Sequence, residues 1–178
     1  SPERKRHGRA GAAGQRPRAR GGSRSLSIDN TVEEFKKLLD DGYKEVILTG
    51  VNVGDYGKNI EANLFNLLQE LIKLNGDFRV RVSSIEPNLL SDEIINLVAE
   101  SDKLCKHFHI PLQSGSSRIL KAMQRRYTTL EYEELIHKVK IKIPTAGIGV
   151  DVIVGFPGET EEDFIHTHNF LTMLNVFN

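Results

Sequence analysis

Hydrophobic positions follow two alternating spacings along most of the chain. Six segments repeat apolar residues every three or four positions, as one face of an amphipathic helix does: residues 31–41, 62–74, 91–100, 116–124, 129–142 and 160–174. Four short runs between them are β-branched or alternate with polar residues, as strands do: residues 44–49, 78–84, part of 104–112, and 148–154. Ser91 and Thr160 are expected to cap helices, and Asp163 is placed to complete an imperfect capping box with Thr160.

Strands that alternate with helices roughly every 30–35 residues are typical of βαβ units. The pattern therefore predicts an α/β fold with a parallel sheet and helices outside it. Four units are visible, and a further strand is expected at either end. This favours a truncated piece of a larger α/β barrel or open sheet.

Composition narrows the class of protein. The chain has 178 residues, enough for a hydrophobic core, and its 39% hydrophobic and 27% charged residues exclude wholesale disorder. No apolar run approaches the ~18 residues that a membrane-spanning helix needs, and no apolar segment of a secretory signal follows the N-terminus. Cys105 is the only cysteine, which excludes an internal disulfide framework and a multi-cysteine metal site within this chain.

Equal numbers of basic and acidic residues, 24 of each, hide an asymmetry. Residues 1–25 contain eight basic residues and one acid, Glu3, so the remainder is acidic. Residues 1–16 form a Gly/Arg-rich head that is predicted to be disordered or foreign to the domain, which would then span residues 17–178. The head is either an arm that attracts nucleic-acid phosphates or, as we prefer, a tag, linker or translation artefact.

Polar and glycine-rich segments follow each predicted strand, where ligands bind in parallel α/β folds. Asn52, Gln113 and Ser114 are candidates to bind an amino acid or a ribose. Glu86 and Asp151 are candidates to hold an ammonium group or ribose hydroxyls.

Each of these residues also has an ordinary structural explanation. Gly155 is a candidate for close backbone approach to a ligand, but its loop is also a common connector between a strand and a helix. His107 and His109 share a face, but two histidines without a third ligand are more often hydrogen-bonded than metal-bound. Agreement among four strand ends nevertheless favours one shared ligand site.

Five segments together resemble the radical S-adenosylmethionine (SAM) methylthiotransferases: residues 46–57 (VILTGVNVGDYG), 83–87 (SSIEP), 109–116 (HIPLQSGS), 123–128 (MQRRYT) and 149–160 (GVDVIVGFPGET). The first two segments are most similar to the branch that modifies threonylcarbamoyladenosine at position 37 of tRNA. The isopentenyladenosine branch and the branch that acts on a ribosomal protein remain alternatives.

The resemblance implies a partial (β/α) barrel of the radical SAM kind. In the family, three cysteines hold a [4Fe–4S] cluster that binds SAM and cleaves it to a radical, and a methylthio group is added to C2 of the adenine. It also implies a tRNA partner, a cytoplasmic location and no membrane partner. It does not indicate an oligomeric state. By the same resemblance, Asn52, Glu86, Gln113, Ser114, Asp151 and Gly155 are expected around the cofactor, and Arg20 and Arg24 at the SAM carboxylate or tRNA phosphate.

The chain departs from the family at the cluster itself. By family spacing the three cysteines belong at positions that hold His7, Gly11 and Gly14. One imidazole and two glycines cannot replace thiolate ligands. We therefore expect a fragment of a methylthiotransferase that is inactive as written. The alternative is a non-catalytic barrel that binds SAM or RNA. A TIM-like enzyme acting on a phosphorylated small molecule is a weaker third hypothesis.

Overall fold

The computed structural model describes residues 25–50 and 52–176. Six α-helices lie in this part of the chain: α1 (Ile28–Asp40), α2 (Leu64–Ile72), α3 (Asp92–Glu100), α4 (Ser117–Ala122), α5 (Thr129–Lys142) and α6 (Glu161–Leu174). The expected caps are confirmed: the Ser91 hydroxyl accepts a hydrogen bond from the third residue of α3, and Thr160 and Asp163 form a complete capping box. Helix α1 begins three residues before the predicted Thr31, because the Ser27 hydroxyl caps it by accepting from the Asn30 amide at 3.2 Å.

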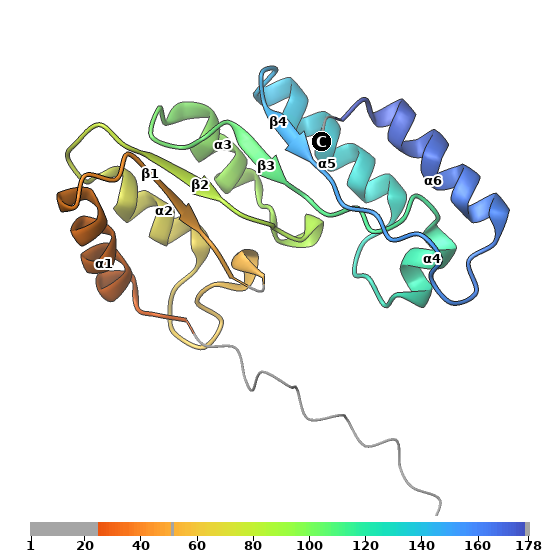
Figure 1. Cartoon of the computed structure of the whole chain (residues 1–178), viewed down its shortest axis with the longest axis horizontal. Helices are drawn as coiled ribbons and strands as arrows, with labels where there is room; N and C mark the ends of the chain where they lie inside the picture. Colours follow the sequence, from red (N-terminus) through yellow and green to blue (C-terminus); the bar gives the residue numbers. More distant parts are fainter. Residues whose placement is uncertain (1–24, 51, 177–178) are drawn as a thin grey trace, which may run out of the picture.

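Four short strands form the sheet: β1 (Glu45–Leu48), β2 (Arg79–Val82), β3 (His107–His109) and β4 (Gly147–Gly149). Strand β1 pairs with β2, and β3 pairs with β4, both in parallel. Parallel bridges join β2 to the chain around β3, and the Ile85 amide donates to the His109 carbonyl at 3.0 Å. The strands therefore lie side by side in chain order, as Figure 1 shows.

Strand β4 differs from its prediction. Regular pairing covers Gly147–Gly149, whereas residues 148–154 were predicted as a strand. Beyond β4 the pairing continues as single bonds, in which the Gln113 amide donates to the Asp151 carbonyl at 2.8 Å. Three residues lead from Ile110 to Gln113, against two from Gly149 to Asp151, so one extra residue interrupts the regular ladder before Gln113, which has a φ of 69°. This explains why an apolar, β-branched run does not form one long strand.

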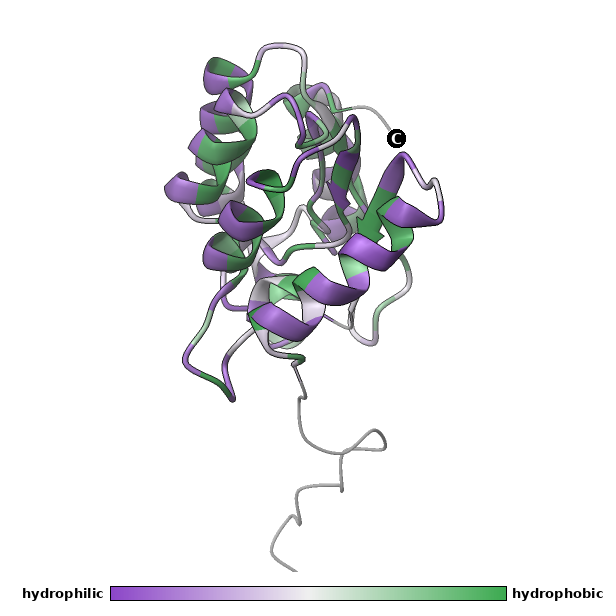
Figure 2. Cartoon of the chain, turned by 90° about the vertical axis from the view of Figure 1, so that its left-hand side faces the viewer, coloured by the Kyte–Doolittle hydropathy of each residue, from purple (hydrophilic) through white to green (hydrophobic). Residues whose placement is uncertain are grey.

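The helices cover one face of the sheet. Val80, Val82, Phe108 and Ile148 are buried in one cluster with apolar residues of α2, α3 and α5. Residues between them in the strands, such as Arg81 and His107, are only half-buried. Each helix in Figure 2 carries both hydrophobic and hydrophilic residues, as expected where one side packs on the sheet. The fold is an α/β partial barrel with parallel strands, as predicted.

Two lysine ammonium groups donate hydrogen bonds to carbonyl groups at the carboxyl ends of helices α2 and α3. The Lys103 ammonium donates to the Ile72 carbonyl at 3.1 Å and lies 4.8 Å from the centre of the Phe78 ring. The Lys106 ammonium donates to the Ala99 and Ser101 carbonyls at 2.9 and 3.0 Å. These contacts tie the start of β3 to the ends of α2 and α3, because the last carbonyls of a helix have no partner within it.

Within residues 25–50 and 52–176, no helix has the length and apolar character needed to cross a membrane.

Candidate functional site

Polar side chains of three neighbouring strands meet at the carboxyl end of the sheet. The His109 imidazole lies between two of them: Nδ1 is 2.5 Å from the Ser84 hydroxyl, and Nε2 is 3.2 Å from the Asp151 carboxylate. The His109 side chain is 28% exposed and that of Asp151 is 64% exposed. This group therefore combines a held imidazole with a carboxylate that solvent can reach.

Two glycines of β4 leave room for the histidine rings of β3. A Cβ atom on Gly149 would lie 3.2 Å from Cδ2 of His109, and one on Gly147 would lie 3.3 Å from Cδ2 of His107. The rings lie across the neighbouring strand at these positions, and this brings His109 to Asp151, two residues beyond Gly149. Burial, together with the nearby Arg81 guanidinium, lowers the pKa of His107 and so favours the neutral form of that ring.

The loop after β1 holds Asn52 beside the same edge. The Asn52 amide donates to the Asp55 carboxylate at 3.2 Å, while its carbonyl oxygen is buried without a partner among the described residues. Gly57 closes the loop with a φ of 86°, and a Cβ there would lie 2.0 Å from the Ala62 carbonyl oxygen. Only glycine fits this position.

Glu86 follows the turn after β2 and faces Arg125, from the loop after α4. The two charged groups are 3.5 Å apart, and Nε of Arg125 is buried without a partner in the described part of the chain. Nearby, the Tyr127 hydroxyl donates to the Pro111 and Leu112 carbonyls at 3.1 Å each. Burial raises the pKa of Tyr127 to about 12, so this hydroxyl stays a donor at neutral pH.

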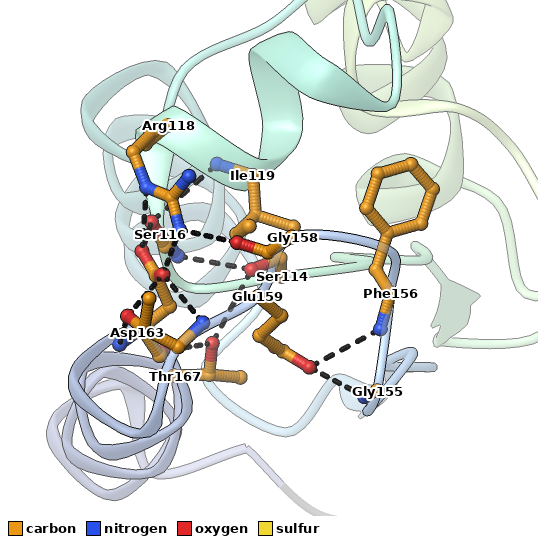
Figure 3. Close-up of polar contacts among 11 residues, drawn as sticks. Ser114, Ser116, Arg118, Ile119, Gly155, Phe156, Gly158, Glu159, Asp163 and Thr167 are labelled. Atoms are coloured by element: carbon orange, nitrogen blue, oxygen red, sulfur yellow. Dashed lines mark hydrogen bonds and ion pairs between the residues drawn. The ribbon is translucent and has the colours of Figure 1, made fainter.

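Ser114 lies inside the fold, in the polar cluster drawn in Figure 3. It is fully buried, and its hydroxyl contacts the Thr167 hydroxyl at 3.3 Å and accepts from the Ser116 amide at 3.1 Å. The Gly115 amide donates to Thr167 at 2.9 Å. Ser114 thus joins the loop after β3 to helix α6, which differs from the ligand contact expected for it.

Asp163 is the charged centre of this cluster, which links α4 to α6 (Figure 3). Its carboxylate accepts from the Ser116 hydroxyl and from the Thr160 hydroxyl at 2.6 Å each, and it pairs with the Arg118 guanidinium. The hydrogen bond from Arg118, followed by those from Ser116 and Thr160, holds the pKa of Asp163 well below its usual range.

Gly155 begins the loop that leads from β4 to α6. It has a φ of 78°, and its amide donates to the Glu159 carboxylate, which also accepts from the Phe156 amide at 3.3 Å. Glu159 therefore holds the backbone of this turn, as Figure 3 shows. A Cβ on Gly155 would meet nothing within 4 Å, so the glycine is required by its φ and not by crowding.

The structure thus brings Asn52, Glu86, Gln113, Asp151 and Gly155 to the carboxyl ends of the strands, and Ser114 to a buried cluster behind them. Arg20 and Arg24 lie outside the described residues, as do His7, Gly11 and Gly14. The central position of His109 was not predicted. Its signal was present in the sequence as a His-x-His strand facing a Gly-x-Gly-x-Asp strand.

The chain does not fit a [4Fe–4S] cluster. Such clusters need several thiolates, and the sequence contains one cysteine, Cys105. Burial raises the pKa of its thiol, which disfavours the thiolate. No group of three His, Cys, Asp or Glu side chains in the described segments could hold a metal ion.

Comparisons with known proteins agree with this architecture. The profile of the radical SAM superfamily matches residues 5–171. Among solved structures, Streptococcus suis SuiB bound to its precursor peptide superposes with a TM-score of 0.60 over 88% of this chain and 32% of that one, at 13% identity. The cobalamin-dependent radical SAM enzyme OxsB gives a TM-score of 0.60 over 82% of this chain and 22% of that one, at 12% identity. These two likenesses show the fold.

Sequence relatives are tRNA-modifying enzymes. The threonylcarbamoyladenosine tRNA methylthiotransferase MtaB of Bacillus subtilis is 44% identical over 87% of this chain and 35% of its own length. The tRNA-2-methylthio-N(6)-dimethylallyladenosine synthase of Alkaliphilus oremlandii is 46% identical over 85% of this chain and 32% of its own length. The chain spans about a third of these curated relatives. It is a relative of tRNA methylthiotransferases, and it belongs to the radical SAM superfamily.

Proposed function

We propose that this chain is part of the catalytic barrel of a cytoplasmic tRNA methylthiotransferase of the threonylcarbamoyladenosine branch. The whole enzyme would add a methylthio group to C2 of the modified adenosine at position 37. The observation that carries the branch assignment is the contact between two loops whose sequences resemble that branch, residues 50–57 and 83–87.

These loops are packed too closely to vary independently. A Cβ on Gly54 would lie 2.7 Å from Cβ of Leu89 and 3.1 Å from Cγ2 of Ile85. A side chain at position 54 would therefore push the second loop away and move Glu86 with it. Two loops that depend on each other in this way form one surface at the sheet edge, where the modified base would be bound.

SAM would bind at the same edge. Its amino and hydroxyl groups require acceptors, which Asp151, Glu86 and the unpartnered carbonyl oxygen of Asn52 supply. Gln113 and Gly155 supply a left-handed backbone beside these groups. Arg20 and Arg24 remain expected contacts for the SAM carboxylate or tRNA phosphate.

The chain as written would be inactive by itself, because it lacks the three thiolates of the cluster. Anaerobic iron–sulfur reconstitution tests this directly. We expect no cluster absorbance to remain after desalting, and a stoichiometric band that persists would contradict the proposal. Calorimetric titration with SAM then separates a barrel that still binds the cofactor from one that keeps only the fold.

The branch is tested with chimeras. Residues 25–175 replace the matching segment of the B. subtilis relative and, separately, of the A. oremlandii relative, so that each host supplies its own cysteines and flanking domains. Mass spectrometry of tRNA nucleosides should detect methylthio-threonylcarbamoyladenosine with the first host. Activity only in the second host, on isopentenyladenosine, would contradict the branch assignment. Iron content of each chimera controls for folding.

A further inference from the structure

The segment that leads from β3 into α5 is basic within an acidic part of the chain. Beyond residue 25 acids outnumber lysines and arginines, yet residues 103–130 contain six lysines and arginines and no Asp or Glu. Four of these six residues lie in or directly after α4: Arg118, Lys121, Arg125 and Arg126. Their contacts decide which of the four charges remain available to a ligand.

Two of the four charges are paired within the fold. Arg118 pairs with the Asp163 carboxylate and donates to the Gly158 carbonyl at 2.8 Å, which fastens α4 to the start of α6 (Figure 3). Arg125 faces Glu86 across 3.5 Å. These two guanidinium groups therefore have carboxylate partners that offset their charge.

The other two cations have no partner. Lys121 and Arg126 are exposed, and neither side chain has a hydrogen bond or an ion pair with any residue of the described segments. The next acid along the chain, Glu131, is directed to the start of α5, where it accepts from the Thr128 amide and hydroxyl at 2.7 and 2.9 Å. The charges of Lys121 and Arg126 can therefore meet an anion from solvent.

The backbone that carries these two cations is held at both ends. At the end of α4 the Gln124 amide donates to the Lys121 carbonyl at 3.0 Å, and the Arg125 amide donates to the Leu120 carbonyl at 2.9 Å. With Gln124 at a φ of 58°, these bonds form a Schellman motif. Further on, the Tyr127 hydroxyl is anchored on two carbonyls of the segment after β3. A bound anion would therefore not have to order this segment, which lowers the entropic cost of binding.

The same segment borders the candidate site. Helix α4 lies beyond the carboxyl end of β3, as Figure 1 shows. Arg125 reaches Glu86 after β2, and Arg126 is the next residue along the chain. A large anionic ligand that reached into the site past α4 would pass the two unpaired cations.

We propose that Lys121 and Arg126 form a basic rim that contacts backbone phosphates of an RNA whose target base enters the candidate site. Lysine and arginine side chains bind phosphates and position a nucleic acid without reading its sequence. The class of ligand rests on the proposed function, in which the substrate is a tRNA. The basic rim would hold the RNA backbone, and the loops at the strand ends would contact the base.

Salt-dependent RNA binding by the full 178-residue chain tests the basic rim. A fluorescent anticodon stem-loop RNA is titrated by anisotropy at several salt concentrations. Each phosphate contact contributes roughly 0.7–0.9 to the slope of log affinity against log salt. The double variant Lys121→Gln/Arg126→Gln should therefore lower this slope by roughly 1.4–1.8 and raise Kd roughly 3- to 30-fold at low salt. The arginines of residues 1–24 are common to all variants, so the differences report on the rim.

Two other lysines provide a matched control. Lys44 and Lys142 are also exposed and have no side-chain partner in the part of the chain that the structure describes. They lie at the opposite edge of the sheet, because Lys44 directly precedes β1 and Lys142 ends the helix that leads into β4. Lys44→Gln/Lys142→Gln removes the same charge and should leave slope and Kd nearly unchanged. Lys121→Arg/Arg126→Lys keeps both charges and should retain most of the affinity.

The outcomes of the binding test are distinct. Equal losses in the two glutamine double variants would mean that only net charge matters, and this would overturn the proposal. No loss in either variant, or no RNA binding by the unmodified chain, would overturn it as well. Equal urea midpoints for all variants, measured by circular dichroism, establish that the fold is intact.

The chimera with the B. subtilis relative separates this inference from the proposed function. In that enzyme the rim double variant should raise KM for tRNA and leave kcat nearly unchanged, because contacts remote from the reacting atoms bind substrate and transition state alike. An inactive unmodified chimera would contradict the proposed function, while RNA binding by the full chain would still decide the role of the rim. An active chimera whose KM does not respond to the double variant would overturn the rim.

Discussion

Helix α6 leaves no space for a side chain on Gly115, and this allows a sharp prediction for Gly115→Ala. A Cβ at this position would lie 2.6 Å from Cα of Thr167 and 2.9 Å from Cβ of Phe170. Both contacts involve atoms that are fixed to the helix and cannot rotate away. The methyl group can be accommodated only if the loop and α6 separate by about 1 Å, to reach an ordinary carbon–carbon distance.

The free energy of this separation has two parts. Overpacking of a well-packed site costs about 1–3 kcal/mol. The 2.9 Å hydrogen bond from the Gly115 amide to the Thr167 hydroxyl is then stretched, which adds about 0.5–1.5 kcal/mol. We therefore expect Gly115→Ala to lower the free energy of unfolding by about 2–4 kcal/mol, a large part of the ~5–15 kcal/mol typical of a domain.

Urea denaturation followed by circular dichroism measures this loss. Gly50→Ala is the matched control, because a Cβ there would lie at an ordinary 3.5 Å from Cγ2 of Val53. Its expected change is below 1 kcal/mol, in line with ordinary surface substitutions. Equal urea midpoints for the two variants would refute the reasoning, since the close approach to α6 would then carry no energetic consequence.

Three further predictions concern stability. The pKa of Asp163 is held below its usual range, chiefly by Arg118, so this carboxylate stabilises the fold above about pH 4 and loses that effect as the pH falls further; the gap in urea midpoint between the unmodified chain and Asp163→Asn should therefore be full at pH 7 and narrow below pH 4, and a constant gap would contradict the assignment. Tyr132→Phe removes a buried hydroxyl that donates to the Ile110 carbonyl at 2.6 Å, and should cost about 1–3 kcal/mol in urea denaturation; no change would mean that the carbonyl finds another donor. Lys106→Met keeps the side-chain stem but removes the ammonium group from the end of α3, and should cost about 1–3 kcal/mol, with increased amide exchange in the last turn of that helix; unchanged exchange would argue against its capping role.

The boundaries of helix α5 were predicted more closely than those of strand β4. The predicted boundaries of residues 129–142 match α5, because local side chains set both ends of a helix. Strand boundaries depend on a partner far along the chain. Residues 148–154 have the composition of a strand, yet regular pairing ends at Gly149 because the neighbouring segment has one extra residue between Ile110 and Gln113. No feature of residues 148–154 themselves could predict this.

In the candidate site, too, the features that depend on element order were predictable, and those that depend on distant partners were not. Glu86 and Asp151 were predicted to lie at one edge because parallel strands place their carboxyl ends together, and this rule needs only the order of elements. The role of His109 depends on register, which brings it opposite Gly149. Ser114 was assigned to the ligand because it follows a strand, but whether such a residue faces the ligand or α6 depends on the packing of a helix about 50 residues later.

The order of the strands also bears on how the domain can be made. Each strand pairs with the one that precedes it, roughly 25–40 residues earlier, which is the length of one βαβ unit. A growing polypeptide that emerges from the ribosome can therefore add each unit to a sheet that already exists, without waiting for a distant segment. The strands are therefore synthesised in the same order in which they join the sheet. Each new strand pairs with the exposed edge of the strand made before it.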